Sequence, residues 1–248
     1  MKLVLDTWAG NQPGDLAQVI GVSGVILRGG QGNWGDADFA SDWQRYRREK
    51  PEWKLGVYHV FDPYYTTAAH IDRMMRYMPD DVDLPIVLDV ELDRGKTNSD
   101  IISRVTELYN ALKAAYDRVM IYTGGWWWNV HMTPSPAWQP SANFWLARYP
   151  LATYPPVTCS WEELTRYYPT GWVPALNGGG NAVMWQWSGD KFTLPGYNGK
   201  LDLNFVPDHI WENWVGEDES PQPTLEERVT RLETEAREHG WEVWQNER

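Results

Sequence analysis

Two carboxylates stand one residue apart at the end of an apolar run in this sequence. The run is PIVLDVE, residues 85–91, and its acids are Asp89 and Glu91. Side chains at positions i and i+2 of a strand share a face, so both should point the same way, with Cα atoms roughly 6–7 Å apart. Cleavage of a glycosidic bond uses such a pair: a protonated carboxyl donates to the leaving oxygen and an ionised one stabilises positive charge at the anomeric carbon. Repulsion between the two, helped by burial, should raise the pKa of one member.

Two further acids favour this interpretation over a strand that simply ends in a solvated loop. Asp6 ends the first strand-like run, KLVLD. Asp202 begins the last run, but residues 188–200 contain the turn-rich LPGYNG without a helical pattern, so the last two strands are expected to form a hairpin. That reversal would bring Asp202 to the edge where the other three acids lie.

Alternating strand and helix patterns supply the framework for these acids. Eight strands are predicted, at residues 3–8, 24–28, 55–61, 85–91, 118–123, 144–148, 182–187 and 201–206. Helices are predicted at residues 15–20, 39–50, 67–78 and 99–116, with a brief helical pattern near 161–167. Because the last third lacks regular crossover helices, the α/β pattern favours an irregular (β/α) barrel over a doubly wound sheet or a regular eightfold barrel.

The C-terminal part has a different composition. Residues 216–224 (GEDESPQPT) are acidic and contain Pro, which is typical of a linker, so the barrel domain is expected to span residues 1–215. Residues 225–248 should include an amphipathic helix, whose apolar positions follow a 4-3-4 spacing. These positions are Leu225, Val229, Leu232 and Ala236. A helix of this length is marginal alone in water, so docking on the barrel and self-association are both open, with wall targeting third.

Composition narrows the classes of partner. The net charge of −12 would repel nucleic acid, so no nucleic-acid partner is expected. The 17 Trp and 13 Tyr against 5 Phe suit sugar rings, because Trp and Tyr combine a flat apolar face with a hydrogen-bonding edge. Cys159 is the only cysteine, which excludes a disulfide framework and a cysteine metal cluster. The histidines show no ligand spacing, so we expect no metal and no cofactor.

The N-terminal residues give an expectation about location. Residues 1–5 run directly into a strand pattern without a basic region, a long apolar stretch or a cleavage site, so no signal peptide is expected. No run of about 18 apolar residues suggests a membrane span. We therefore expect synthesis in the cytoplasm and, if the protein works outside the cell, release by another system.

Eight short segments resemble, in the same order, the sequence blocks of glycoside hydrolase family 25, the muramidases of bacteria, fungi and phage endolysins. The segments are LDTW (5–8), DFASDW (38–43), GVYHVF (56–61), LDVE (88–91), IYTG (121–124), FWLARY (144–149), WQWS (185–188) and PGYNGKLDLN (195–204). The resemblance implies a barrel of five β/α units plus three further strands. It also implies a lysozyme that hydrolyses the β-1,4 bond between N-acetylmuramic acid and N-acetylglucosamine, with peptidoglycan glycan strands as partner and an endolysin-like, antimicrobial setting.

Carried over residue by residue, the resemblance assigns the catalytic positions to Glu91, Asp89, Asp6 and Asp202. Glu91 would be the proton donor. Asp89 would stabilise the developing charge or orient the 2-acetamido group of the substrate, and the other two acids would tune this pair and hold substrate.

The resemblance also implies substrate-facing residues at strand ends. These are Tyr58, Tyr122, Trp145 and Gln186. Packing in the barrel core is the alternative role for the aromatic members. His59 alternates with Tyr58 along a strand, so only one of them faces inward, and a structural, hydrogen-bonded His59 is expected.

The chain departs from the family pattern at two places. One is the triple Trp at 126–128, which suits a sugar platform, a protein contact or a fold-back on the following loop. The other is Val60–Phe61, where the family more often has Phe followed by a small residue. These departures leave the lining of the sugar subsites open.

Two other functions compete with a muramidase. A chitinase-like glycosidase is disfavoured because its longer acidic motif needs acids where this chain has Ile86, Val87 and Leu88. A catalytically weak peptidoglycan-binding or phage structural barrel is disfavoured because a pure binder has no need for a costly cluster of like charges.

Overall fold

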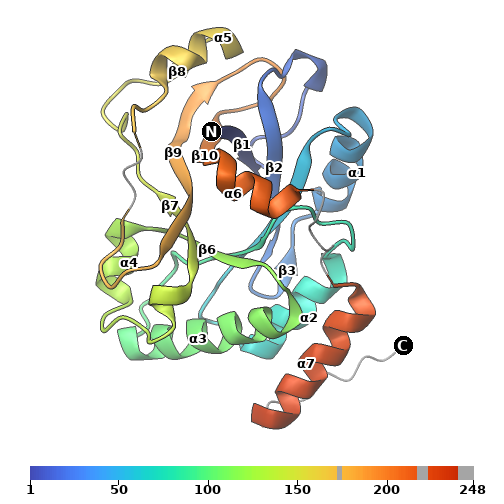
Figure 1. Cartoon of the computed structure of the whole chain (residues 1–248), viewed down its shortest axis with the longest axis vertical. Coiled ribbons are helices and arrows are strands. Elements are labelled where there is room, and N and C mark those ends of the chain that lie inside the picture. Colours follow the sequence, from blue (N-terminus) through green and yellow to red (C-terminus); the bar gives the residue numbers. More distant parts are fainter. Residues whose placement is uncertain (172–174, 217–222, 240–248) are drawn as a thin grey trace.

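Eight strands close into a barrel in the computed structural model, which describes residues 1–171, 175–216 and 223–239 (Figure 1). In sequence order they are β1 (Lys2–Thr7), β2 (Val22–Gln31), β4 (Lys54–Val60), β5 (Ile86–Asp89), β6 (Val119–Gly124), β7 (Asn143–Ala147), β9 (Asn181–Thr193) and β10 (Leu201–Val206). Neighbouring strands pair in parallel from β1 to β9, whereas β10 is antiparallel to both β9 and β1. The expected irregular α/β barrel and the reversed last strand are both confirmed.

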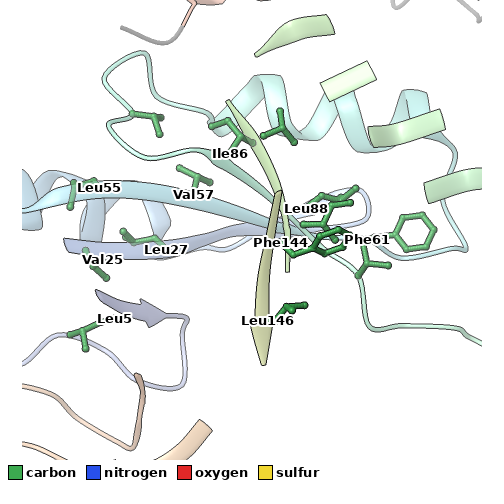
Figure 2. Close-up of a cluster of buried hydrophobic side chains, with 14 of the residues drawn as sticks. Leu5, Val25, Leu27, Leu55, Val57, Phe61, Ile86, Leu88, Phe144 and Leu146 are labelled. Carbon is green, nitrogen blue, oxygen red and sulfur yellow. The ribbon is translucent and has the colours of Figure 1, made fainter. Parts of the chain in front are cut away.

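Alternation along the strands produces two apolar layers, one outside and one inside the barrel. Figure 2 shows part of the outer layer, to which β1, β2, β4, β5 and β7 all contribute buried side chains. The inner layer includes Val4 and Val87. Two residues further along the same faces come Asp6 and Asp89, so the strands turn polar inside at their C-terminal ends.

Helices cover the outer layer unevenly. The long ones are α1 (Phe39–Glu49), α2 (Thr67–Tyr77) and α3 (Asn98–Ala115). After β6 only short elements connect the strands: α4 (Gly125–His131), η2 (Gln139–Ser141), α5 (Trp161–Leu164) and η3 (Thr165–Tyr167). Two short strands, β3 (Trp34–Gly35) and β8 (Val157–Thr158), pair with β2 and β9. Within the described ranges no helix is long and apolar enough to cross a membrane.

The helix α6 (Asp208–Val215) closes one end of the barrel. Its Trp211 and Trp214 are buried in the inner layer beside Leu84, which precedes β5, and Val206, which ends β10. Arg118, just before β6, donates a hydrogen bond to the carbonyl of Trp214. An apolar floor therefore seals the end of the barrel opposite the acids.

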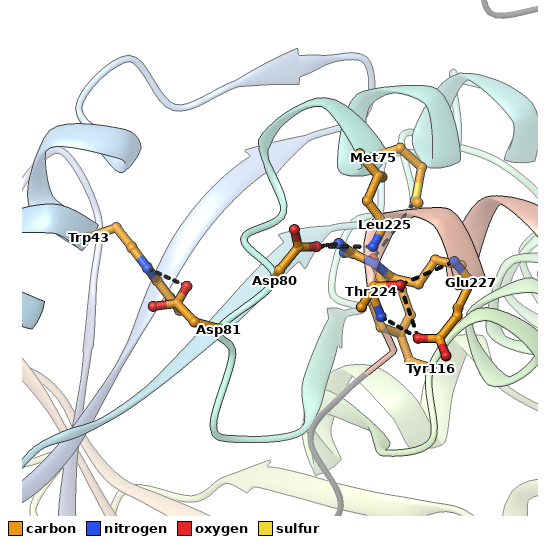
Figure 3. A network of polar contacts seen from close by, with 9 residues as sticks. Trp43, Met75, Asp80, Asp81, Tyr116, Thr224, Leu225 and Glu227 are labelled. Carbon is orange, nitrogen blue, oxygen red and sulfur yellow. Dashed lines mark hydrogen bonds and ion pairs between the residues drawn. The ribbon is translucent and has the colours of Figure 1, made fainter.

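The C-terminal helix α7 (Leu225–His239) lies against α3 on the outside of the barrel (Figure 1). Its backbone N–H at Leu225 donates to Asp80 Oδ1 over 3.0 Å (Figure 3). Arg228 is only 1% exposed and donates to the same Asp80 oxygen over 2.5 Å and to the Tyr116 hydroxyl over 3.2 Å. Of the expected apolar stripe, Ala236 is buried, but Leu225 is 43% exposed.

Within the described residues α7 thus contacts α3, Asp80 and Tyr116. The role of this helix, docking on the barrel or self-association, stays a prediction. Residues 217–222 of the expected linker 216–224, and residues 240–248 of the tail, lie outside the described residues.

Some predicted elements differ from the observed ones. The strand expected at 85–91 ends at Asp89, although the Val90 N–H still donates to the carbonyl of Tyr122 over 2.9 Å and keeps this stretch extended. The helix expected at 15–20 is a short 3₁₀ turn, η1 (Leu16–Gln18). Neither α4 nor α6 was predicted, because both are short and rich in Trp rather than in strong helix formers.

Candidate active site

All the site residues predicted from the sequence line one pocket of about 270 Å³ at the open end of the barrel. They are Glu91, Asp89, Asp6, Asp202, Tyr58, Tyr122, Trp145 and Gln186. The remaining lining residues are Trp8, Arg28, Gln31, Val60 and Leu92. The acids come from β1, the end of β5 and β10, so closure of the barrel is what gathers them.

Asp6 and Asp202 are neighbours across the β1–β10 pairing. A hydrogen bond between their carboxyls lowers the pKa of Asp6 and raises that of Asp202, although burial is the largest cause of the raised pKa at both. The backbone N–H of Asp190 also donates to Asp202 Oδ1, over 2.6 Å. That N–H stabilises the charged form of Asp202 and opposes the rise in its pKa, but burial still raises the pKa of Asp202 well above its ordinary value, whereas that of Asp6 rises to about 6. Asp6 is therefore the first of the two to lose its proton.

Amide donors hold the Asp6 carboxylate in place. Asn204 Nδ2 and Gln186 Nε2 donate to Asp6 Oδ2, over 2.8 and 3.1 Å. Burial raises the pKa of Asp6 to about 6, and these two hydrogen bonds act against that rise because they stabilise the charged form. The carboxyl of Asp6 therefore loses its proton at a pH of about 6.

Gln186 and Asn204 are themselves oriented by aromatic side chains. The hydroxyls of Tyr122 and Tyr149 donate to Gln186 Oε1 over 2.7 and 2.5 Å, which turns its amide N–H toward Asp6. Trp145 Nε1 donates to Asn204 Oδ1 over 2.8 Å. Tyr122, Trp145 and Gln186 therefore line the pocket and also position Asp6, a second role that their predicted contact with substrate did not include.

Asp89 and Glu91 both have raised pKa values. Burial is the largest cause for Asp89, followed by the charges of Glu91 and Asp6. Burial is also the largest cause for Glu91, and Asp6 supplies the repulsion. The sequence led us to expect that Asp89 and Glu91 would act on each other. Glu91 does raise the pKa of Asp89, whereas the repulsion that raises the pKa of Glu91 itself comes from Asp6.

One oxygen of this cluster has no partner. Asp89 Oδ1 is buried and accepts or donates no hydrogen bond within the described residues. Leaving such an atom unsatisfied costs roughly 1–3 kcal/mol. A ligand group that hydrogen-bonds to Asp89 Oδ1 would remove this cost on binding.

The alternation of Tyr58 and His59 is as expected. Tyr58 lines the pocket, whereas His59 is fully buried behind the strand, with Nδ1 2.7 Å from the Tyr77 hydroxyl and Nε2 2.8 Å from His70 Nδ1. His59 is a structural residue. Among the described residues, no group of three or more His, Cys, Asp or Glu has the arrangement of a metal site.

Sequence reasoning missed Arg28, the cation that lines this pocket. Its Nε donates to Asp36 Oδ2 over 2.9 Å, and its guanidinium lies 5.0 Å from the ring centroid of Trp8 and 5.2 Å from that of Trp34. Arg28 lowers the pKa of Asp89 against the stronger effect of burial. Its place at the end of a predicted strand, on the same edge as the acids, was the signal that could have identified it.

Comparison with known proteins places this geometry in a family. The family model for glycosyl hydrolases family 25 matches residues 6–196. No curated protein sequence matches the chain significantly.

Three solved structures illustrate the likeness of fold. The lysozyme of Streptomyces coelicolor is 19% identical with a TM-score of 0.64, covering 83% of this chain and 91% of that chain. A muramidase from Acremonium alcalophilum is 18% identical with a TM-score of 0.67, covering 88% and 100%. The catalytic domain of an endolysin from bacteriophage P40 of Listeria monocytogenes is 16% identical with a TM-score of 0.58, covering 88% and 98%.

At these identities the structural likeness supports the fold, and the family model supports the assignment. The matched residues 6–196 begin at Asp6, include Asp89 and Glu91, and end shortly before Asp202. The protein is a glycoside hydrolase, and the chain belongs to glycosyl hydrolases family 25.

Proposed function

We propose that this protein is a muramidase that hydrolyses the β-1,4 bond between N-acetylmuramic acid and N-acetylglucosamine in peptidoglycan. Similar folds include proteins described as a lysozyme, a muramidase and a phage endolysin. The observation that carries the proposal is the meeting of Glu91, whose pKa is raised, and Asp6, which ionises near neutral pH, in one pocket. A glycosidase needs one protonated and one charged carboxyl at the same pH.

Glu91 is the proton donor in this proposal. It is only partly buried in the wall of the pocket, and burial together with the charge of Asp6 raises the pKa of its carboxyl, which favours the protonated form. As the glycosidic bond breaks, the proton passes from Glu91 to the leaving oxygen. Positive charge develops at the anomeric carbon at the same time.

Asp89 orients the substrate. Its unpartnered Oδ1 is suited to the N–H of a 2-acetamido group, which then lies where its carbonyl oxygen approaches the anomeric carbon. In the alternative role Asp89 loses its proton and stabilises the charge directly. Asp6 and Asp202 tune this pair, while the rings of Tyr58, Tyr122 and Trp145 provide apolar faces for the sugar.

The proposed setting follows that of an endolysin. The enzyme is made in the cytoplasm and acts on the bacterial cell wall after another component has released it. The charge of −12 opposes nucleic acid as a partner and leaves the uncharged faces of the glycan as the natural ligand.

The test replaces Glu91 by Gln, which keeps the shape but has no proton to donate. We expect a loss of about 10²–10⁴ in kcat, measured by release of reducing ends from purified peptidoglycan. Glu162→Gln is the matched control, since it makes the same change at an exposed position of α5 outside the pocket.

Circular dichroism must show that both variants fold. Near-wild-type turnover by Glu91→Gln would exclude this residue as the proton donor. Binding of peptidoglycan without turnover by the wild type would favour a structural or binding barrel, and preferential cleavage of chitin oligomers would favour a chitinase-like enzyme.

A further inference from the structure

The three consecutive Trp residues at 126–128 have three different environments. Trp128 is 1% exposed, and its Nε1 donates to Gln139 Oε1 over 3.0 Å. Trp127 is 9% exposed and stacks on His131 with ring centroids 4.7 Å apart. Trp126 is 56% exposed. The first two are packing residues, so folding accounts for them, and the exposed ring of Trp126 requires another explanation.

The ring of Trp126 is held in a defined place at the open end of the barrel. It folds back over Gly124, the last residue of β6, where an added Cβ would lie 2.3 Å from Trp126 Cζ2. On another side it packs against Tyr149, with ring centroids 5.5 Å apart at 47°. The sequence thus keeps a glycine at 124 to let this exposed ring lie close to the end of the strand.

Two side chains, Tyr149 and Gln186, connect this ring to the acids. Its neighbour Tyr149 donates to Gln186, and Gln186 donates to Asp6. Trp126 also lines a second pocket of about 230 Å³ together with Gly125, Leu146, Ala147, Arg148 and Ala175. Trp126 thus belongs to the second pocket and contacts Tyr149, whose hydroxyl holds Gln186 in the wall of the pocket with the acids.

The pocket with the acids is too small for a long strand. Its volume of about 270 Å³ is at or below the low end of small-molecule sites, roughly 300–1,000 Å³. A polymer cut there must continue over the rim of the barrel. Trp126 is an exposed aromatic face on that rim, beside the second pocket.

We propose that Trp126, with Tyr149 and the second pocket, forms a distal subsite for an N-acetylhexosamine ring of the glycan strand. The proposal rests on the proposed muramidase function and extends it to the length of substrate that the enzyme prefers. The sugar stacks on the open face of Trp126, and its N-acetyl and hydroxyl groups lie toward the pocket at Arg148. The contacts from Trp126 through Tyr149 to Gln186, which lines the pocket of the acids, favour a glycan over a separate protein partner.

The test measures kcat/KM on peptide-free glycan oligomers of two, three and four disaccharide units. For the wild-type enzyme we expect kcat/KM to rise with length. Trp126→Ala should lower the ratio of kcat/KM for the longest to that for the shortest oligomer about tenfold, the size expected for the loss of one well-packed aromatic contact. Trp126→Phe keeps an aromatic face and should restore part of the ratio.

Val130→Ala is the matched control, because Val130 lies on the same helix α4, is 59% exposed and lines neither pocket. For this variant, the ratio of kcat/KM for the longest oligomer to that for the shortest, which we call the length ratio, should equal that of the wild type. A length ratio for Trp126→Ala that also equals the wild-type value would overturn the subsite.

A wild type that cleaves none of the oligomers would contradict the proposed function instead. In that case, calorimetric titration of the longest oligomer into the wild type and Trp126→Ala still decides on the subsite. Equal affinities would overturn it, and weaker binding by Trp126→Ala would support it.

Discussion

The replacement Asp6→Asn tests how the charge of Asp6 raises the pKa of Glu91. Burial and the negative charge of Asp6 together raise the pKa of Glu91. The amide introduced by this replacement has nearly the same shape as the carboxylate but carries no charge. The pKa of Glu91 should fall, so the alkaline limb of kcat/KM should move to lower pH, because Glu91 must hold its proton to act as an acid.

The size of the change follows from the dimensions of the pocket. A sphere of 270 Å³ is about 8 Å across, and both carboxyls line it. Two unit charges about 8–10 Å apart interact by roughly 2 kcal/mol at an effective dielectric constant of about 20. That energy corresponds to about 1.5 pH units, and screening by solvent at the open mouth reduces it to about one.

The assay is the pH profile of kcat/KM on a soluble glycan oligomer. Asp202→Asn is the matched control, because its amide still donates to Asp6 and still accepts from the Asp190 N–H, as the protonated acid does. We expect its alkaline limb to stay in place. If Asp6→Asn is too slow to assay, the ¹³C shift of the Glu91 carboxyl in the free protein reports the same pKa.

Two results would refute this reasoning. One is an alkaline limb and a Glu91 pKa that are unchanged in Asp6→Asn, which would leave burial as the sole cause. The other is a change in Asp202→Asn as large as in Asp6→Asn, which would mean that the charge resides on Asp202.

Four other features of the structure give further predictions. The pKa of Asp89 is higher in the folded protein than in the unfolded chain, so the stabilising contribution of this carboxyl is present at low pH and lost as pH rises. Asp89→Asn should therefore raise the melting temperature more at pH 7 than at pH 4. Burial lowers the pKa of His70 to about 4, so between about pH 6.5 and pH 4 this residue binds a proton in the unfolded chain but not in the folded protein. Its contribution to stability should decline as pH falls through that range, so thermal scans should show the melting temperature of His70→Gln rising relative to that of the wild type. Asp80→Ala leaves the buried guanidinium of Arg228 without its carboxylate and should destabilise the protein by up to about 3–5 kcal/mol. Arg228→Met leaves the side chain of Asp80, which is 64% exposed, in contact with water, so it should destabilise the protein much less. Denaturant unfolding that gives the opposite order would contradict this account. A chain truncated at Glu219 should keep turnover on soluble oligomers, and a drop in sedimenting mass would reveal self-association through α7.

The positions of the acids could be predicted because they depend on the simplest rules of strand geometry. Asp89 and Glu91 share a face by their spacing, and Asp6 ends a parallel strand. The turn-rich loop before Asp202 was enough to reverse β10. Each of these inferences needs only local sequence and the closure of the sheet.

The parts that were not predicted depend on contacts distant in the sequence. Gln186 was expected to face substrate. It lines the pocket, but the hydroxyls of Tyr122, on β6, and Tyr149, just after β7, also turn its amide toward Asp6. The helical pattern at the C-terminal end led us to expect a buried Leu225 and an exposed Arg228. The structure shows the reverse, because Arg228 is 1% exposed and Leu225 is 43% exposed. The burial of Arg228 depends on Asp80 and Tyr116, more than 100 residues earlier, and no periodicity within the helix contains that information.

The reversed last strand also has a consequence for synthesis on the ribosome. Asn204 and Asp6, which share a hydrogen bond in the pocket, are 198 residues apart. Chains fold from the N-terminus as they emerge, so β1 forms early but lacks its β10 neighbour until almost the whole barrel has been made. A growing chain, or one that terminates early, has neither Asp202 nor the amide of Asn204 beside Asp6. The enzyme therefore cannot assemble its acids before translation of the barrel is complete, and the unpaired edge of β1 makes that interval the time of greatest exposure to aggregation.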